Sequence, residues 1–283
     1  PAATAQAVDA DVRAARRERR RARRRSREQL GQLADRDLVP PALDWIDRAP
    51  EQPFLLVVWT VQAHAPYVNG EPPALLDARD PNLNRYLNAL REDDRMIADL
   101  LQGLAARGVL DATLLVVTGD HGESFGAHGV RFHGRSLDDD EVLVPLVLSH
   151  PSLRSTAPAR RSTIAQQIDV APTILDLLGL PIPAPWQGDS LFAVQRSNEA
   201  FLVSVFETTR FGLVRDERKY VFDERLEPLA LRDRSGDPDE RRDLALRPDE
   251  HAAIADARAR LAGWLRAQDA YLERLLGSGA SGD

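Results

Sequence analysis

A run of apolar residues that passes directly into a glycine-rich polar loop constrains the fold of this chain more than any other feature. Leu114–Val117 is the apolar run, and Gly119–Gly129 follows with the sequence GDHGESFGAHG. A short apolar run closed by glycine predicts a buried strand of a parallel sheet. Ligands of open α/β sheets bind just beyond the carboxyl ends of the strands. Asp120 and His121 stand at that point, so the sequence indicates a metal site; the alternative is a polar turn that caps the next helix.

The same pattern predicts a second strand at Pro53–Thr60, which reads PFLLVVWT. His64 follows that strand as Asp120 follows the first one. Because ligand-binding groups gather beyond strand ends, we expect His64 to converge with Asp120 and His121 on a single pocket.

Two helices are predicted around these strands. Pro40–Arg48 begins with proline, which suits a first helical turn. Asn84–Leu110 is longer and carries an apolar stripe. The stripe consists of Leu87, Leu90, Ile97, Leu101 and Leu104. Asp94 falls inside it, and we expect this carboxylate to bond to a loop or an arginine, because a carboxylate on an apolar face must find a partner.

The pattern of apolar and polar residues changes near Phe192. Before this point, it predicts a third apolar strand at Val142–Leu148 and a helix from Asp169 to Gly179. Beyond it, short segments with polar turns predict an antiparallel sheet. These segments are Ala200–Phe206, Phe211–Val214 and Tyr220–Phe222. A charged loop at Arg232–Arg242 and a last helix over about Asp249–Leu276 follow.

Composition excludes several kinds of site. Cysteine is absent, so the chain has no disulfide, thiolate ligand or cysteine nucleophile. The net charge is −7, yet residues 1–37 hold eleven arginines against six Asp and Glu, which gives this arm about +5 and the remainder about −12. The arm favours a solvated helix. It lacks stacking aromatics, so we expect no nucleic-acid binding; an arm that binds nucleic acid or an anionic membrane is the least favoured alternative.

Several segments resemble, in the same order, the catalytic domain of the sulfatase family within the alkaline-phosphatase superfamily. They are QAHAPY at Gln62–Tyr67, GDHGE at Gly119–Glu123, FHG at Phe132–Gly134, LVPL at Leu143–Leu146, DVAPT at Asp169–Thr173, GDSL at Gly188–Leu191 and the stretch Asp237–Leu244. Each segment is weak evidence alone, and their shared order makes the assignment. The resemblance covers about residues 40–275.

The resemblance implies an α/β fold with a mixed sheet between helix layers and a small C-terminal antiparallel sheet and helix. It divides the chain into an Arg-rich arm at residues 1–37, a partial sulfatase-like core at 38–195 and a C-terminal sheet plus helix at 196–283. It also implies hydrolysis or transfer at a sulfate or phosphate ester. The family uses a Ser, Thr or formylglycine nucleophile, with a divalent metal that polarises the ester oxygen.

Functional residues carry over by motif. Asp120 and His121 would be metal ligands, with Ca²⁺ as the expected ion and Mg²⁺, Mn²⁺ or Zn²⁺ as alternatives. His64 would contact the ester oxygens or protonate the leaving oxygen. His133 would bind the same oxygens, where many relatives place lysine; the alternative is a helix-capping or loop histidine. Glu123 is expected to hold the glycine loop rather than bind metal.

The sequence also departs from the family pattern. The first acidic metal ligands and the nucleophile motif have no counterpart here, Gln62-Ala63 replaces Asp-Pro, and Leu143 stands where arginine is usual. We therefore expect a fragment whose partner is the missing N-terminal half of its own domain, and which alone binds metal weakly and is inactive. The complete enzyme would be extracytoplasmic: periplasmic, secreted or membrane-tethered through an upstream segment. The alternative is a degenerate, non-catalytic binding domain of the same fold.

Overall fold

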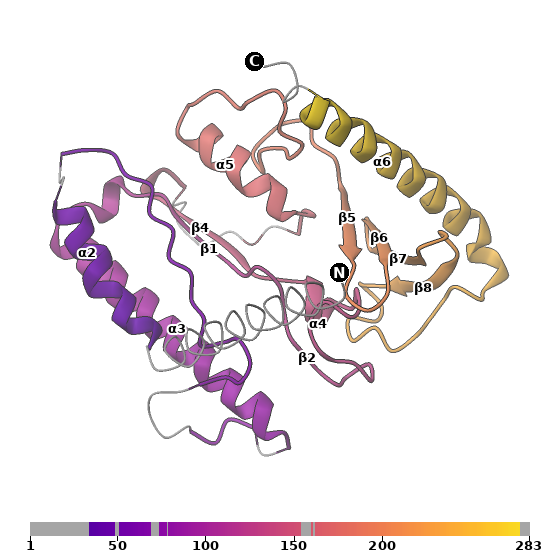
Figure 1. The fold of residues 1–283 in the computed structure, drawn as a ribbon, viewed down its shortest axis with the longest axis horizontal. Helices are drawn as coiled ribbons and strands as arrows, with labels where there is room; N and C mark the ends of the chain where they lie inside the picture. Colours follow the sequence, from indigo (N-terminus) through magenta and orange to yellow (C-terminus); the bar gives the residue numbers. More distant parts are fainter. Residues whose placement is uncertain are drawn as a thin grey trace, which may run out of the picture. The chain divides into compact units, whose positions relative to one another are not determined.

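The computed structural model describes residues 34–48, 51–68, 74–77, 79–153, 160 and 162–277. Residues 1–33 of the expected arm lie outside this part of the chain. The chain divides into two compact units, Pro1–Thr113 and Leu114–Asp283 (Figure 1). None of the described helices has the length and apolarity needed to cross a membrane. The division into three domains at residues 37 and 195 stays a prediction.

The first unit is built on two helices. The 3₁₀ helix η1 (Asp35–Leu38) leads into α2 (Val39–Asp47), which packs along α3 (Pro81–Ala106), and η2 (Leu110–Ala112) ends the unit (Figure 1). The core between these helices consists of Val39, Ile46, Met96, Leu100 and Leu104. Asp80 starts α3, because its side chain accepts hydrogen bonds from the backbone of Asn82 and Leu83. Both helices predicted for this region are confirmed.

The face that α3 buries differs from the predicted stripe. Leu104 is buried and Ile97 packs on the core as predicted, but Leu90 is 40% exposed, and the core also takes Met96 and Leu100, which the stripe did not include. Asp94 is exposed, so the expectation that it needs a partner on an apolar face was wrong. The helix packs against α2 and η1, and the partly buried carboxylate on it is Asp93, beside Asp35, rather than Asp94.

The strand predicted at Pro53–Thr60 is not formed. The segment is extended, with Leu56 and Val58 packed on the core, while Leu55, Val57 and Trp59 are 78%, 79% and 74% exposed. This alternation is that of a strand with one covered face. A strand also needs a hydrogen-bonded neighbour, and the described residues form no ladder with this segment.

The second unit begins with two short ladders. Strand β1 (Leu115–Thr118) pairs with β4 (Leu146–Ser149), and β2 (Ser124–Phe125) pairs with β3 (Arg131–Phe132). The strand at residues 114–117 was expected in a parallel sheet, but its partner β4 is antiparallel. The third predicted strand starts later than expected, because Asp139–Val142 forms the helical turn α4 and Pro145 has no N–H to give to a ladder.

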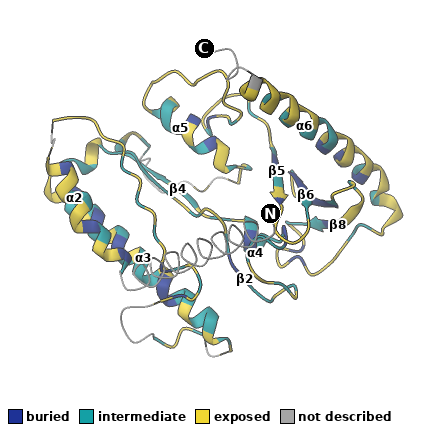
Figure 2. Ribbon diagram, in the orientation of Figure 1, coloured by how far each residue is buried: buried dark blue, intermediate teal, exposed yellow. Residues whose placement is uncertain are grey.

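The rest of the second unit is a four-stranded sheet covered by a helix. The antiparallel sheet contains β5 (Glu199–Ser204), β6 (Arg210–Arg215), β7 (Arg218–Asp223) and β8 (Pro228–Asp233), in that order. The long helix α6 (His251–Gly277) packs one side on it through Ile254, Ala257 and Leu261, and its other side is exposed (Figure 2). The remaining elements are η3 (Pro151–Leu153), η4 (Gln167–Asp169), α5 (Val170–Leu177) and η5 (Pro248–Glu250).

The predicted antiparallel sheet and last helix are confirmed. Strand β8 was missed, because its end falls in the charged stretch predicted as a loop.

Candidate active site

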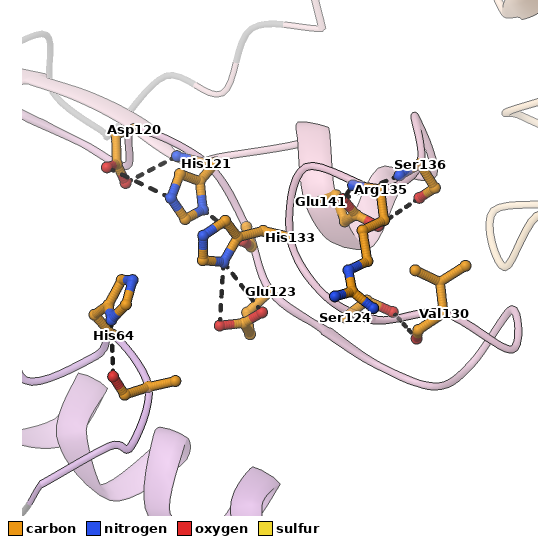
Figure 3. Close-up of polar contacts among 12 residues, drawn as sticks. His64, Asp120, His121, Glu123, Ser124, Val130, His133, Arg135, Ser136 and Glu141 are labelled. Atoms are coloured by element: carbon orange, nitrogen blue, oxygen red, sulfur yellow. Dashed lines mark hydrogen bonds and ion pairs between the residues drawn. The ribbon is translucent and has the colours of Figure 1, made fainter. Parts of the chain in front are cut away.

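Asp120 and His121 face each other just beyond β1. The carboxylate Oδ2 of Asp120 lies 3.7 Å from Nε2 of His121, and its Oδ1 accepts a hydrogen bond from the His121 backbone at 2.9 Å. Nδ1 of His121 lies 2.8 Å from the carbonyl oxygen of Gly122 (Figure 3). A carbonyl oxygen can only accept, so Nδ1 donates this hydrogen bond, and Nε2 is the ring nitrogen that faces the carboxylate.

The loop behind this pair is held by later parts of the chain. Gly122 donates its N–H to the Glu141 carbonyl at 2.8 Å, and a Cβ on Gly122 would lie 2.2 Å from the Asp140 carbonyl oxygen. Only glycine fits there. Gln167 donates to the carbonyls of residues 119 and 120 at 2.9 and 2.5 Å. The backbone that presents Asp120 is therefore fixed from two sides.

His133 stacks on His121. Their ring centroids lie 3.9 Å apart with an interplanar angle of 28° (Figure 3). Nδ1 of His133 is 3.3 Å from Oε1 and 3.4 Å from Oε2 of Glu123, whose side chain is only 4% exposed. The structure thus brings Asp120, His121 and His133 together, and it adds Glu123 as a carboxylate that orients His133.

Glu141 fixes the loop that follows His133. This buried carboxylate accepts hydrogen bonds from the backbone of Arg135 at 2.9 Å and of Ser136 at 3.3 Å, and from the Ser136 hydroxyl at 2.6 Å (Figure 3). The sequence alone gives Glu141 no role, because it ends a run of four acidic residues at positions 138–141 and nothing in that run distinguishes it.

The Asp120–His121 pair fits two positions of a divalent-cation shell. A carboxylate oxygen and an imidazole nitrogen, both exposed and 3.7 Å apart, have the chemistry and the spacing of adjacent ligands. Among the described residues, no group of three or more His, Asp or Glu side chains could hold a metal ion. These two residues fit a cation, but they do not complete its shell.

His64 belongs to the first unit. It lies in a turn in which its N–H donates to the Val61 carbonyl at 3.1 Å and its Nδ1 lies 2.8 Å from the Ala65 carbonyl oxygen. As in His121, Nδ1 is the donor in this contact, because a carbonyl oxygen can only accept. The convergence of His64 with the residues of the second unit stays a prediction.

The buried carboxylate of Asp35 anchors the turn that carries His64. It accepts hydrogen bonds from the backbone of Val61 at 3.0 and 3.1 Å and of Gln62 at 2.8 Å, while the Gln62 side chain accepts from the Asp35 backbone at 2.6 Å. Gln62 replaces the aspartate of the family pattern, and here it forms half of this clamp.

Asp93 lies against the clamp. Burial, followed by the hydrogen bond and the charge of Asp35, raises the pKa of Asp93 to about 7. Asp93 therefore holds a proton in the folded protein at mildly acidic pH, whereas an unfolded aspartate would lose it near pH 4. Stability from this group is fully present below about pH 4 and is lost as the pH rises to about 7.

Replacing Asp93 with asparagine, which mimics the protonated carboxyl, is expected to raise the free energy of unfolding at pH 8 by roughly 1–2 kcal/mol. At pH 4 the change should be small, since the aspartate is then protonated in the folded protein. Urea denaturation at the two pH values measures the difference. The matched control is Asp94→Asn, an exposed neighbour on the same helix. An equal effect of Asp93→Asn at both pH values would contradict the assignment.

Comparison with known protein families gives two matches. Residues 9–180, more than half of the chain, match the sulfatase family model. Residues 126–266 match a model described as N-sulphoglucosamine sulphohydrolase, C-terminal. The expected alkaline-phosphatase and sulfatase-like α/β fold is confirmed by similar solved structures.

Three similar proteins illustrate the kinds of enzyme that this chain resembles. The chain is 26% identical over 211 residues to the Delta 4,5-hexuronate-2-O-sulfatase of Bacteroides thetaiotaomicron, covering 68% of this chain and 44% of that protein. Phosphonate monoester hydrolase of Agrobacterium radiobacter matches at 25% identity and a TM-score of 0.58, over 66% of this chain and 41% of that one. BT4656, solved with its substrate D-glucosamine-2-N,6-O-disulfate, matches at 23% identity and a TM-score of 0.57, over 70% and 44%. The chain spans less than half the length of each.

Proposed function

This chain belongs to the sulfatase family, and we propose that it supplies the cation-binding part of a catalytic domain that acts on sulfate or phosphate esters. One observation carries the proposal: the carboxylate of Asp120 faces Nε2 of His121 at 3.7 Å, and the ring of His133 stacks directly on His121. Two adjacent ligands can hold a cation, and the neighbouring ring of His133 can contact the anionic group that the cation binds.

Each residue then has a distinct task. Asp120 and His121 bind the divalent cation, with Ca²⁺ as the first candidate and Mg²⁺, Mn²⁺ or Zn²⁺ as alternatives. When bound, that cation polarises an ester oxygen and lowers the pKa of the nucleophile. His133, oriented by Glu123, donates a hydrogen bond to the ester oxygens. His64 contacts the same oxygens or gives a proton to the leaving oxygen.

We further propose that the remaining ligands and the nucleophile come from a segment outside this sequence. Asp120 and His121 fill only part of a cation shell, and no described cluster supplies more. Residues 54–61 support this proposal, because they run extended with Leu55, Val57 and Trp59 exposed and no ladder partner among the described residues. A neighbouring strand would satisfy their backbone groups and cover these side chains. The extracytoplasmic location of the complete protein belongs to the same proposal.

The ester we propose first is a sulfate on a sugar. Two proteins similar to this chain act on sulfated sugars: one is a hexuronate-2-O-sulfatase, and the other was solved with the substrate D-glucosamine-2-N,6-O-disulfate. Phosphonate monoester hydrolase is similar as well, so a phosphorus ester is the second candidate. Transfer to another alcohol uses the same groups as hydrolysis. A degenerate, non-catalytic binding domain is the alternative function.

Turnover assays test this proposal. We expect the purified chain to release no product from p-nitrophenyl sulfate or p-nitrophenyl phosphate, with or without Ca²⁺. A polypeptide extended upstream in its own reading frame should gain cation-dependent turnover. His64→Ala in that polypeptide should lower kcat about 10²–10⁴-fold, and the control His251→Ala, at the start of α6, should not.

Robust turnover by the chain alone would contradict the expected need for a further segment. An extended polypeptide that binds sulfated sugars without turnover would favour the non-catalytic alternative.

A further inference from the structure

Arg135, two residues after His133 in the chain, lies close to two phenylalanine rings. The guanidinium of Arg135 is 5.8 Å from the ring centroid of Phe132 and 5.6 Å from that of Phe206. Phe132 and Arg135 come from the loop that carries His133, and Phe206 follows β5. The two phenylalanines are 45% and 56% exposed. Because both rings are this exposed, packing in the protein core does not explain the cluster.

The backbone holds this cluster in place. The Ser204 hydroxyl donates to the Gly134 carbonyl at 2.7 Å, which joins the end of β5 to the His133 loop. Glu141 accepts from the Arg135 backbone, as described above. Phe132 has a φ of 72°, in the left-handed region that bulky residues rarely adopt. Strain of this kind persists only where surrounding contacts impose it, and it concentrates at ligand sites.

The guanidinium is available to an anion. Its ion pair is with Glu207, whose side chain is 58% exposed, at 3.2 Å, and the side chain of Arg135 is itself 36% exposed. Ion pairs this exposed contribute only about 0–1 kcal/mol, so a sulfate or carboxylate can displace Glu207. The planar guanidinium suits two-point binding of such an anion, and the flanking phenyl rings offer apolar faces to the ring that carries it.

We propose that Phe132, Arg135 and Phe206 form a substrate subsite that takes a second anionic group, a sulfate or a carboxylate, on a sugar whose ester lies at Asp120, His121 and His133. This inference rests on the proposed function and names its substrate class as sugars with at least two anionic groups. Arg135 binds the second anion, and the phenyl rings pack against the sugar.

Binding to the full chain tests the subsite. D-Glucosamine-6-sulfate and D-glucosamine-2-N,6-O-disulfate are titrated in the presence of Ca²⁺, and binding is followed by chemical-shift changes. We expect the disulfate to bind about tenfold more tightly than the monosulfate. Arg135→Gln should remove that preference and leave monosulfate binding within about twofold. Arg135→Lys, which keeps the charge but loses the planar fork, should retain an intermediate preference.

The matched control is Arg241→Gln. Arg241 is 78% exposed in the same unit and pairs with Asp239 at 3.0 Å, so its loss changes the net charge equally. The inference is overturned if wild-type protein binds both sugars equally, or if the two glutamine variants weaken disulfate binding to the same extent. Failure of wild-type protein to bind either sugar would overturn the proposed function together with the subsite. Urea denaturation confirms that each variant is folded.

Discussion

Replacing Lys219 with methionine is expected to destabilise the second unit by about 3–5 kcal/mol. Lys219 is the single lysine of the chain and is fully buried. Its Nζ lies 2.7 Å from Oδ1 of Asp139 and 2.5 Å from Oε1 of Glu240. Methionine fills a similar volume but leaves two carboxylates beside each other, and Arg234, 3.3 Å from Asp139, offsets them in part. An uncompensated buried charge is among the most destabilising changes known for single substitutions.

The loss of these ion pairs should also loosen the loop of the candidate site. Asp139 opens α4, and its backbone N–H donates to Glu240 at 2.7 Å. The same turn holds Gly122 through the Glu141 carbonyl. Urea denaturation measures the loss of stability, and amide hydrogen exchange at Gly122 measures the loosening of the loop. The control Arg241→Gln breaks an exposed pair and should change stability by less than about 1 kcal/mol. A similarly small effect of Lys219→Met would contradict this account of the buried cluster.

Replacing Asp120 with asparagine is expected to weaken divalent-cation binding at least tenfold. The chain offers two ligands, so the wild-type dissociation constant should be weak, about 10⁻³ M. Asparagine keeps an oxygen near the cation but removes the negative charge, which is the larger part of the attraction for a doubly charged ion. Calorimetric titration with Ca²⁺ or Mn²⁺ measures the change.

Asp239→Asn is the matched control for this variant. The side chain of Asp239 is 67% exposed and that of Asp120 is 61% exposed, so both substitutions remove one surface charge. If both variants lowered the affinity equally, the cation would be held by the general negative charge of the chain and not by the Asp120–His121 pair.

The sequence was informative where local pattern decides the structure. The apolar run before Asp120 and His121 predicted the strand that presents them, and the FHG motif predicted that His133 belongs with them. Their closeness is confirmed in the second unit. The helices α2 and α3 were predicted for the same reason, since a leading proline and an apolar stripe are local properties of the sequence.

The sequence was misleading where contacts between distant residues decide the structure. The strand expected at residues 53–60 has the right alternation but no partner among the described residues. On α3, the choice between Asp93 and Asp94 depends on how α2 and η1 pack against the helix, which periodicity does not resolve to one residue. Lys219 meets Asp139 across 80 positions of sequence, so no local pattern could indicate that ion pair.

The most direct test of the cation site uses the six histidines of the chain as reporters. Mn²⁺ broadens the NMR signals of nearby ring protons, and the effect falls steeply with distance. We predict that the signals of His121 and His133 broaden first, followed by His64 if both units contribute to one site. His150, at the opposite end of the β1–β4 ladder from the Asp120 loop, should broaden later. First broadening at His150, or equal broadening of all six rings, would contradict a cation site at Asp120 and His121.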